Sequence, residues 1–272
     1  MPASGADNLF SEPARSPYDW EFFFLGFHVR VGWTFWVFSA LIGYAWARGL
    51  DMEYYEQDLV TPGLGILLAI WIGVSFVSIL IHELGHSVAM KYYGIDSYIV
   101  LYHMGGLAVP RGTTGLSRSR LTHWNQIVIS LAGPAAQFAF GAIVAAVAFS
   151  IGHPMGVAGW LLGLLGVPLP ISEPFSNAIW TGLIDAAIFT SIFWALVNLL
   201  PVLPLDGGRI MQNIIGWNRR TSGFEEATKV SILVCVAIVF GALQIRDNTL
   251  AFYFVVIGVI NFQNLQDGSY RL

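Results

Sequence analysis

Long apolar runs separated by short polar segments dominate this chain of 272 residues. A run of about 20 mostly apolar residues is long enough to cross a bilayer as a helix. The pattern predicts six such helices, at 31–48, 63–91, 124–150, 178–203, 228–245 and 248–265. A seventh apolar stretch at 155–170 is shorter and rich in Gly and Pro, so we expect it to lie at the membrane surface or to dip in from outside.

The charges of the connecting segments alternate along the chain. The first connection (RGLDMEYYEQD) is acidic, and the third, around 151–177, contains neither Lys nor Arg. The basic residues of the second connection are Lys91, Arg111, Arg118 and Arg120, and those of the fourth are Arg209, Arg219, Arg220 and Lys229. Because cytoplasmic loops carry the excess of Lys and Arg, we expect a multi-pass protein of the cell membrane with both termini in the cytoplasm.

The composition argues against a soluble protein. Hydrophobic residues make up 56% of the chain and charged residues only 11%, whereas a soluble domain carries about 25% charged residues. Charges this sparse cannot form the polar surface of a soluble protein, so we expect a lipid bilayer around the helices. The net charge is −4 and the basic residues form no stripe, so we expect no nucleic-acid partner. The predicted fold class is an all-α polytopic membrane protein.

The N-terminal segment differs from the rest of the chain. Its first 20 residues are polar and net acidic, without the basic and apolar regions of a cleaved signal peptide. The aromatic residues of WEFFFLGF (20–27) suit the headgroup level of a membrane. We therefore expect residues 1–27 to form a tail and an interfacial segment, and residues 28–272 to form a single domain.

The second predicted helix contains a His-Glu-x-x-His pattern at His82, Glu83 and His86. Histidines four residues apart share one face of a helix, where two imidazoles can bind one zinc ion, while the carboxylate beside them can act as a general base toward zinc-bound water. Both histidines would lie about 8–14 Å below Lys91, toward the cytoplasmic side of the membrane. The alternative is that these side chains only form hydrogen bonds with neighbouring helices.

A second polar motif, NLLPVLPLDGGR, begins at Asn198 near the end of the fourth predicted helix. A catalytic zinc site usually has three protein ligands, and Asp206 is expected at the depth of the two histidines. Irregular backbone around the prolines is tolerated at this depth where it lines a watery cavity, and the amide of Asn198 could stabilise an oxyanion there. The alternative is that Asp-Gly-Gly only forms a turn.

These two motifs together resemble the site-2 protease family of intramembrane zinc metalloproteases. The resemblance implies that His82, His86 and Asp206 bind one zinc ion, and that Glu83 and Asn198 are catalytic. HVRVGWTFWVF (28–38) resembles the family's entry into its first span, and the resemblance extends over about 25–215.

Two further stretches match the same family. YGIDSYIVLYHMGGLAVP (93–110) resembles its strand-forming loop, which dips into the membrane after the zinc-binding helix. Gly105 and Gly106 in this loop would let an extended substrate approach and pair with a strand edge, or would only make a tight turn. SLAGPAAQF (130–138) resembles the family's Ala-Gly-Pro turn, with Gln137 where the family has Asn. We expect Gly105, Gly106 and Gln137 to contact substrate, whereas His103 is expected to be a polar loop residue.

The expected function is hydrolysis of peptide bonds in or near the transmembrane segments of membrane proteins. The expected substrate is a single-span membrane protein, with the active site toward the cytoplasm. We expect a compact member of the family without PDZ or CBS domains. A homo-oligomer or a regulatory membrane partner is compatible with the sequence. The alternatives are an inactive relative, or a metal-binding or transport protein, in which polar residues would follow a path at several depths.

Overall fold

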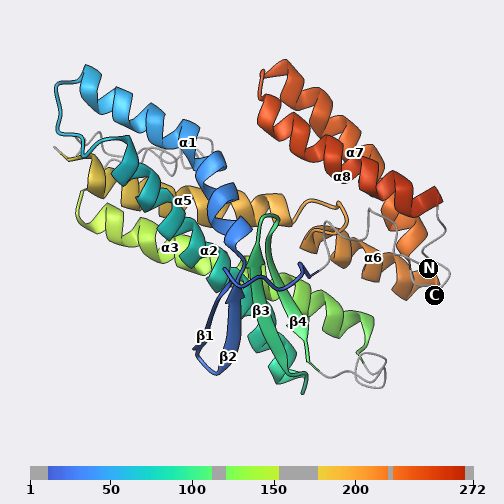
Figure 1. Cartoon of the computed structure of the whole chain (residues 1–272). Helices are drawn as coiled ribbons and strands as arrows, with labels where there is room; N and C mark the ends of the chain where they lie inside the picture. Colours follow the sequence, from blue (N-terminus) through green and yellow to red (C-terminus); the bar gives the residue numbers. More distant parts are fainter. Residues whose placement is uncertain (1–11, 112–120, 153–176, 220–222, 267–272) are drawn as a thin grey trace.

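The computed structural model describes residues 12–111, 121–152, 177–219 and 223–266 (Figure 1). Its strands are β1 (Trp20–Phe24), β2 (Phe27–Val31), β3 (Ser97–Tyr102) and β4 (Gly105–Pro110). Its helices are α1 (Trp33–Glu56), α2 (Leu64–Tyr92), α3 (His123–Ser150), α5 (Ala178–Asn198), α6 (Asp206–Arg219), α7 (Phe224–Gln244) and α8 (Asn248–Gln266). The expected surface segment at 155–170 lies outside the described residues.

Helix α2 lies among α1, α3 and α5 and contacts strands β3 and β4. Small residues allow this close packing. A Cβ atom at Gly85 would overlap the backbone of Ala132 in α3, and one at Gly43 of α1 would overlap the ring of Trp71. Close approach of helix backbones through small residues is typical of helix pairs in membranes. As a result, the polar motif of α2 is enclosed by neighbouring helices.

Five of the described helices are long and apolar enough to cross a membrane: α2, α3, α5, α7 and α8. They correspond to five of the six predicted spans. Helix α1 covers the remaining predicted span, 31–48, but does not meet the same criteria. Its several Trp and Tyr residues and Arg48 lower its hydropathy, although aromatic residues suit a membrane interface. The count of six spans therefore stays a prediction.

A four-stranded sheet lies beside the helices, with strand order β1-β2-β3-β4. Strands β1 and β2 pair antiparallel, β2 and β3 parallel, and β3 and β4 antiparallel. Strands were expected only in the loop after α2, and WEFFFLGF was expected to be an interfacial segment. The sheet therefore has more strands than expected, because this segment supplies β1 and the start of β2, while its interfacial location stays a prediction. Phe27, Val29 and Val31 are buried against β3 and α2, so the aromatic run also serves as a sheet edge.

The fourth predicted span, 178–203, ends earlier than expected. Helix α5 stops at Asn198, and an irregular segment containing Pro201 and Pro204 leads into α6. Helix α6 was not predicted, because its polar residues were assigned to a loop. Buried side chains hold the irregular segment: Leu203 donates its N–H to Ser231 of α7 (2.9 Å), and its carbonyl accepts from Asn261 of α8 (2.7 Å).

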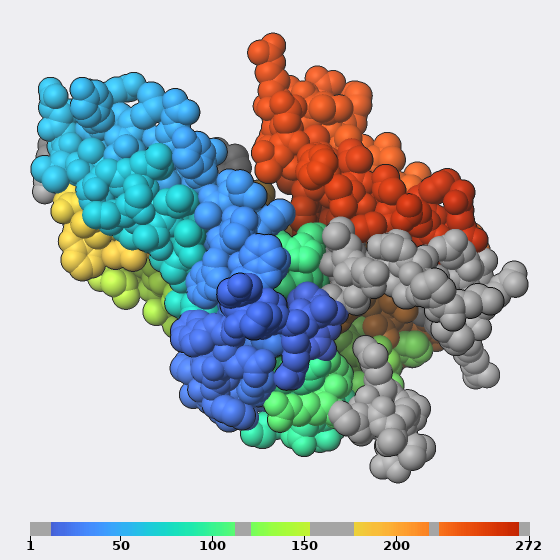
Figure 2. All heavy atoms as spheres, viewed as in Figure 1, coloured from blue at the N-terminus to red at the C-terminus, as the bar shows by residue number. Residues whose placement is uncertain are grey.

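Helices α7 and α8 pack side by side and lie apart from α1 and α2 (Figure 1). The space-filling view shows a hollow between the surface of α1 and that of α7 and α8 (Figure 2). The buried side chains of Val202, Leu205 and Cys235 pack with residues of α8. The segment before α6 is thus held by the α7–α8 pair, while the polar motif of α2 belongs to the other group of helices.

Candidate metal centre

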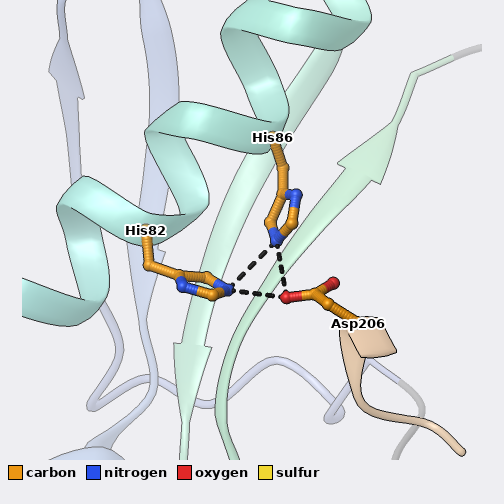
Figure 3. Close-up of side chains that lie close together, drawn as sticks. All are labelled: His82, His86 and Asp206. Carbon is orange, nitrogen blue, oxygen red and sulfur yellow. Dashed lines mark hydrogen bonds and ion pairs between the residues drawn. The ribbon is translucent and has the colours of Figure 1, made fainter. Parts of the chain in front are cut away.

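His82 and His86 project from α2 toward Asp206, the first residue of α6 (Figure 3). The Nε2 atom of His82 lies 3.0 Å from Asp206 Oδ2, and that of His86 lies 3.2 Å from the same oxygen. The two Nε2 atoms are 3.1 Å apart. All three residues are buried. Among the described residues, they form the one group of three or more His, Cys, Asp or Glu side chains that could hold a metal ion.

The other ring nitrogen of each histidine has its own hydrogen-bond acceptor. His82 Nδ1 donates to Gln137 Oε1 (2.9 Å), and His86 Nδ1 donates to the carbonyl of Ile129 (2.7 Å). With a proton on each Nδ1, a neutral imidazole presents a lone pair at Nε2. Two such lone pairs and a carboxylate therefore converge in a buried space. This arrangement requires a positive charge at its centre, either an additional proton or a metal ion.

The geometry fits a zinc ion. Ligand atoms of a tetrahedral zinc site with bonds of about 2.0–2.1 Å lie roughly 3.3 Å apart. The three ligand atoms lie 3.0 to 3.2 Å apart, so a small outward movement would accommodate the ion. Two imidazoles and one carboxylate are also a ligand set typical of catalytic zinc.

Asp206 is positioned by the irregular segment and by two glycines. A Cβ atom at Gly207 would overlap the backbone of Leu199, and one at Gly208 would overlap that of Val202 and Leu203. The first turn of α6 therefore packs directly against the end of α5. Burial would raise the pKa of Asp206, but without a metal ion an additional proton on the imidazoles, with their positive charge and hydrogen bonds, holds it below its usual range.

A cavity of about 110 Å³ adjoins the three converging side chains, enough for several water molecules. Glu83 and Asn198 both line it. The Glu83 carboxylate and the Asn198 amide have no hydrogen-bond partner within the described part of the chain, so both are available to a bound molecule. The structure thus brings the five residues of the two sequence motifs together around one cavity.

The three residues expected to contact substrate lie in different places. Gly106 lines the cavity, and a Cβ atom there would overlap the side chain of Glu83. Gly105 begins β4 with a positive φ of 112° and lies near the ring of Trp194. Gln137 is fully buried behind His82 and does not line the cavity. His103 also lies away from the cavity, with Nδ1 at 3.4 Å from Thr34 Oγ1.

Several residues that contribute to the site were not singled out from the sequence. The carbonyl of Ile129 orients His86, and Ser231 and Asn261 hold the segment before Asp206. Every residue has a main-chain carbonyl, so the sequence does not show which carbonyl will accept a hydrogen bond from a histidine. The polar residues Ser231 and Asn261 in the apolar helices α7 and α8 could have indicated such contacts, because a polar side chain in an apolar helix usually has a specific partner.

Gly133 in α3 offers a direct test of the histidine geometry. A Cβ atom at this position would overlap the imidazole of His86. We expect Gly133→Ala to displace the ring and to weaken zinc binding by about 10–100-fold, the range seen when the support of a metal ligand is lost. Competition with a zinc chelator would measure this change.

Gly73→Ala in α2 is the matched control, because a Cβ atom there meets no other atom within 4 Å. It should leave zinc affinity unchanged. Equal affinity of Gly133→Ala and the wild type would contradict the described position of His86.

Known zinc metalloproteases are similar to this chain. The model of the family described as Peptidase family M50 matches residues 70–242. A putative zinc metalloprotease of Synechocystis sp. is 31% identical over 261 residues, covering 89% of this chain and 59% of the relative. A zinc metalloprotease of Methanocaldococcus jannaschii is 27% identical over 179 residues, covering 63% of this chain and 42% of the relative. The chain thus spans about half the length of these relatives.

A solved structure shares the fold. The site-2 protease from Methanocaldococcus jannaschii superposes with a TM-score of 0.50 at 22% identity, covering 91% of this chain and 95% of that one. The family match includes the part of α2 that carries the histidines, and α6, which begins with Asp206. With its five apolar helices, this is a multi-pass membrane protein, and the chain belongs to peptidase family M50, the site-2 protease family of zinc metalloproteases.

Proposed function

We propose that this protein is an intramembrane zinc metalloprotease, which hydrolyses peptide bonds in or near transmembrane segments of other membrane proteins. The observation that carries the proposal is the convergence of His82, His86 and Asp206 beside a cavity lined by Glu83 and Asn198. His82, Glu83 and His86 all lie in α2, a helix of membrane-spanning length and composition. A substrate segment would therefore reach the cavity from within or close to the bilayer.

His82, His86 and Asp206 would hold the zinc ion. When bound, zinc supplies a Lewis acid that acidifies water and polarises a carbonyl group. Glu83 lies next to His82 in sequence but is not one of the three converging groups, so its carboxylate can serve as general base. In this scheme Glu83 accepts the proton of the attacking water and later delivers it to the amine released when the C–N bond breaks.

Asn198 would stabilise the negative charge that develops on the substrate carbonyl oxygen. Its side chain is at the end of α5 and faces the cavity. An amide N–H is a suitable donor, because such donors act strongly where water is excluded.

Strand β4 offers a place for an extended substrate. It is one of the two edge strands of the sheet, and the consecutive residues Gly106, Leu107 and Ala108 all line the cavity. Side chains of a strand alternate between its two faces, so three consecutive lining residues indicate that the edge of β4 faces the cavity. A substrate helix must unwind before cleavage, and its exposed backbone could then pair with this edge. Gly106, where a Cβ atom would overlap Glu83, would bring this edge close to the proposed general base.

The orientation and the limits of the functional unit are also proposals. The basic connections would place the ends of α2 and α6, with the active site, toward the cytoplasmic side of the cell membrane. Residues 28–272 would act as one domain, to which the preceding β1 adds an edge strand. The expected substrate remains a single-span membrane protein.

A metal carrier remains the second candidate, together with an inactive relative. A carrier would need ligands at several depths, whereas the described residues place their metal-binding group at a single level. Retention of both Glu83 and Asn198 beside that group favours a hydrolase over either alternative.

Metal removal tests the proposal directly. The purified protein, reconstituted in proteoliposomes with a library of labelled single-span substrates, is expected to cleave at least one of them. Treatment with 1,10-phenanthroline should reduce cleavage to background, and added zinc should restore it, because the ligand set binds zinc reversibly. Stoichiometric zinc binding without cleavage of any member would favour the carrier or the inactive relative.

A further inference from the structure

Gln137 lies at the centre of a buried hydrogen-bond network behind the metal centre. Its Oε1 accepts from His82 Nδ1, while its Nε2 donates to Ser78 Oγ (2.9 Å) and to the carbonyl of Thr190 (3.1 Å). Ser78 in turn lies 3.1 Å from Ser191 Oγ. Gln137, Ser78 and Ser191 have no exposed surface. The network joins α3, which carries Gln137, to α2 and α5.

The chemistry of the partners determines how the Gln137 amide is oriented. The Thr190 carbonyl can only accept a hydrogen bond, so it must face the NH₂ group of Gln137. The reverse orientation would place two oxygens against each other in a buried site, which is unfavourable. Oε1 therefore faces His82, and an acceptor at that position requires the proton of the imidazole on Nδ1.

We propose that Gln137 is a positioning residue that selects the metal-binding tautomer of His82, with its Nε2 lone pair directed at Asp206 and His86. This inference rests on the zinc site of the proposed function. It gives Gln137 a different role from the substrate contact expected from the sequence, because the side chain does not reach the cavity. The amide acts through the imidazole and touches neither the substrate nor the ion.

The geometry distinguishes this role from simple filling of space. Gln137→Met keeps a similar volume but removes both the acceptor and the donor. Gln137→Glu keeps an oxygen facing His82 Nδ1, and in its neutral form also keeps a donor toward Thr190. A residue that only fills space would tolerate Met better than Glu, because a buried carboxyl group is costly. A positioning residue would show the opposite order.

The experiment measures zinc affinity of the purified full chain by chelator competition, and the absorption spectrum of the cobalt-substituted protein. We expect Gln137→Met to raise the zinc Kd by about 10–100-fold, as loss of a partner behind a metal-binding histidine does. It should also change the cobalt absorption bands, which report the ligand set. Gln137→Glu should stay closer to wild type in both measurements.

Tyr54→Phe is the matched control, because it removes a buried hydrogen bond between α1 and α5 to Thr181, away from the metal centre. It should lower thermal stability without changing the zinc Kd. An unchanged Kd and cobalt spectrum in Gln137→Met would overturn the proposal for Gln137. Zinc binding by the wild type would in that case still support the zinc site itself. Failure of the wild type to bind zinc would overturn both.

A second measurement tests the proposal without the Gln137→Met variant, in case that variant does not fold. ¹⁵N NMR of the histidine side chains in the zinc-free wild type, assigned with His82→Asn, should show the His82 proton on Nδ1. A proton on Nε2 instead would overturn the proposal.

Discussion

Substrate cleavage by Glu83→Gln is expected to fall by about 10²–10⁴-fold, the usual contribution of a general base. Glutamine has nearly the same size as glutamate, so the tight contact with Gly106 is preserved. It cannot accept a proton from water, however. Because Glu83 is not one of the three converging ligands, the variant should retain its zinc.

This result needs two measurements on the same preparation. Turnover is followed with a single-span substrate that the wild type cleaves in proteoliposomes, and bound zinc is measured by elemental analysis. Glu225→Gln is the control, since Glu225 is exposed and pairs with Lys229 on the outside of α7, away from the metal centre. The Glu225→Gln substitution should change neither the turnover nor the amount of bound zinc. Wild-type turnover by a zinc-loaded Glu83→Gln protein would show that another group removes the proton.

Asp206→Asn is expected to affect metal binding itself. The substitution removes the negative charge that faces the two Nε2 atoms and replaces a carboxylate oxygen by a weaker ligand. We expect zinc affinity to fall by more than the roughly 10–100-fold that loss of an outer partner causes. Cleavage should then disappear at low zinc and recover partly when zinc is added in excess.

Asp247→Asn is a suitable control for this substitution. Asp247 is exposed and accepts from the N–H of Leu250 at the start of α8, a capping role that asparagine fills equally well. A zinc titration monitored by chelator competition separates the two variants. Equal zinc affinity of Asp206→Asn and the wild type would exclude Asp206 as a ligand.

The sequence was informative about the helices for a simple physical reason. A bilayer demands long apolar segments with internally satisfied backbones, so the ranges of α2, α3, α7 and α8 could be predicted closely. The aromatic segment at 20–27 was harder. Its residues suit both a membrane interface and a strand, and only the tertiary structure shows that they pair with β2.

Helix α6 was missed because its pattern is not that of a membrane span. It starts where the prolines end, and it carries polar residues that also suit a loop. Its packing depends on Gly207 and Gly208, which allow contact with the preceding segment, and on the hydrogen bond between His123 and Asn213 (3.0 Å). His123 precedes Asn213 by 90 residues, so this contact cannot be inferred from local pattern.

The chain by itself determined which groups could bind a metal and which could move a proton. The helical spacing of His82 and His86 places two imidazoles on one face, and the motif beginning at Asn198 offers the acid and the amide. Tertiary structure decided how these groups face each other. Gln137 and Ile129 orient the two rings, and the α7–α8 pair holds the segment that presents Asp206. Such orientation arises from hydrogen bonds between residues far apart in the sequence, which only the packed helices bring together.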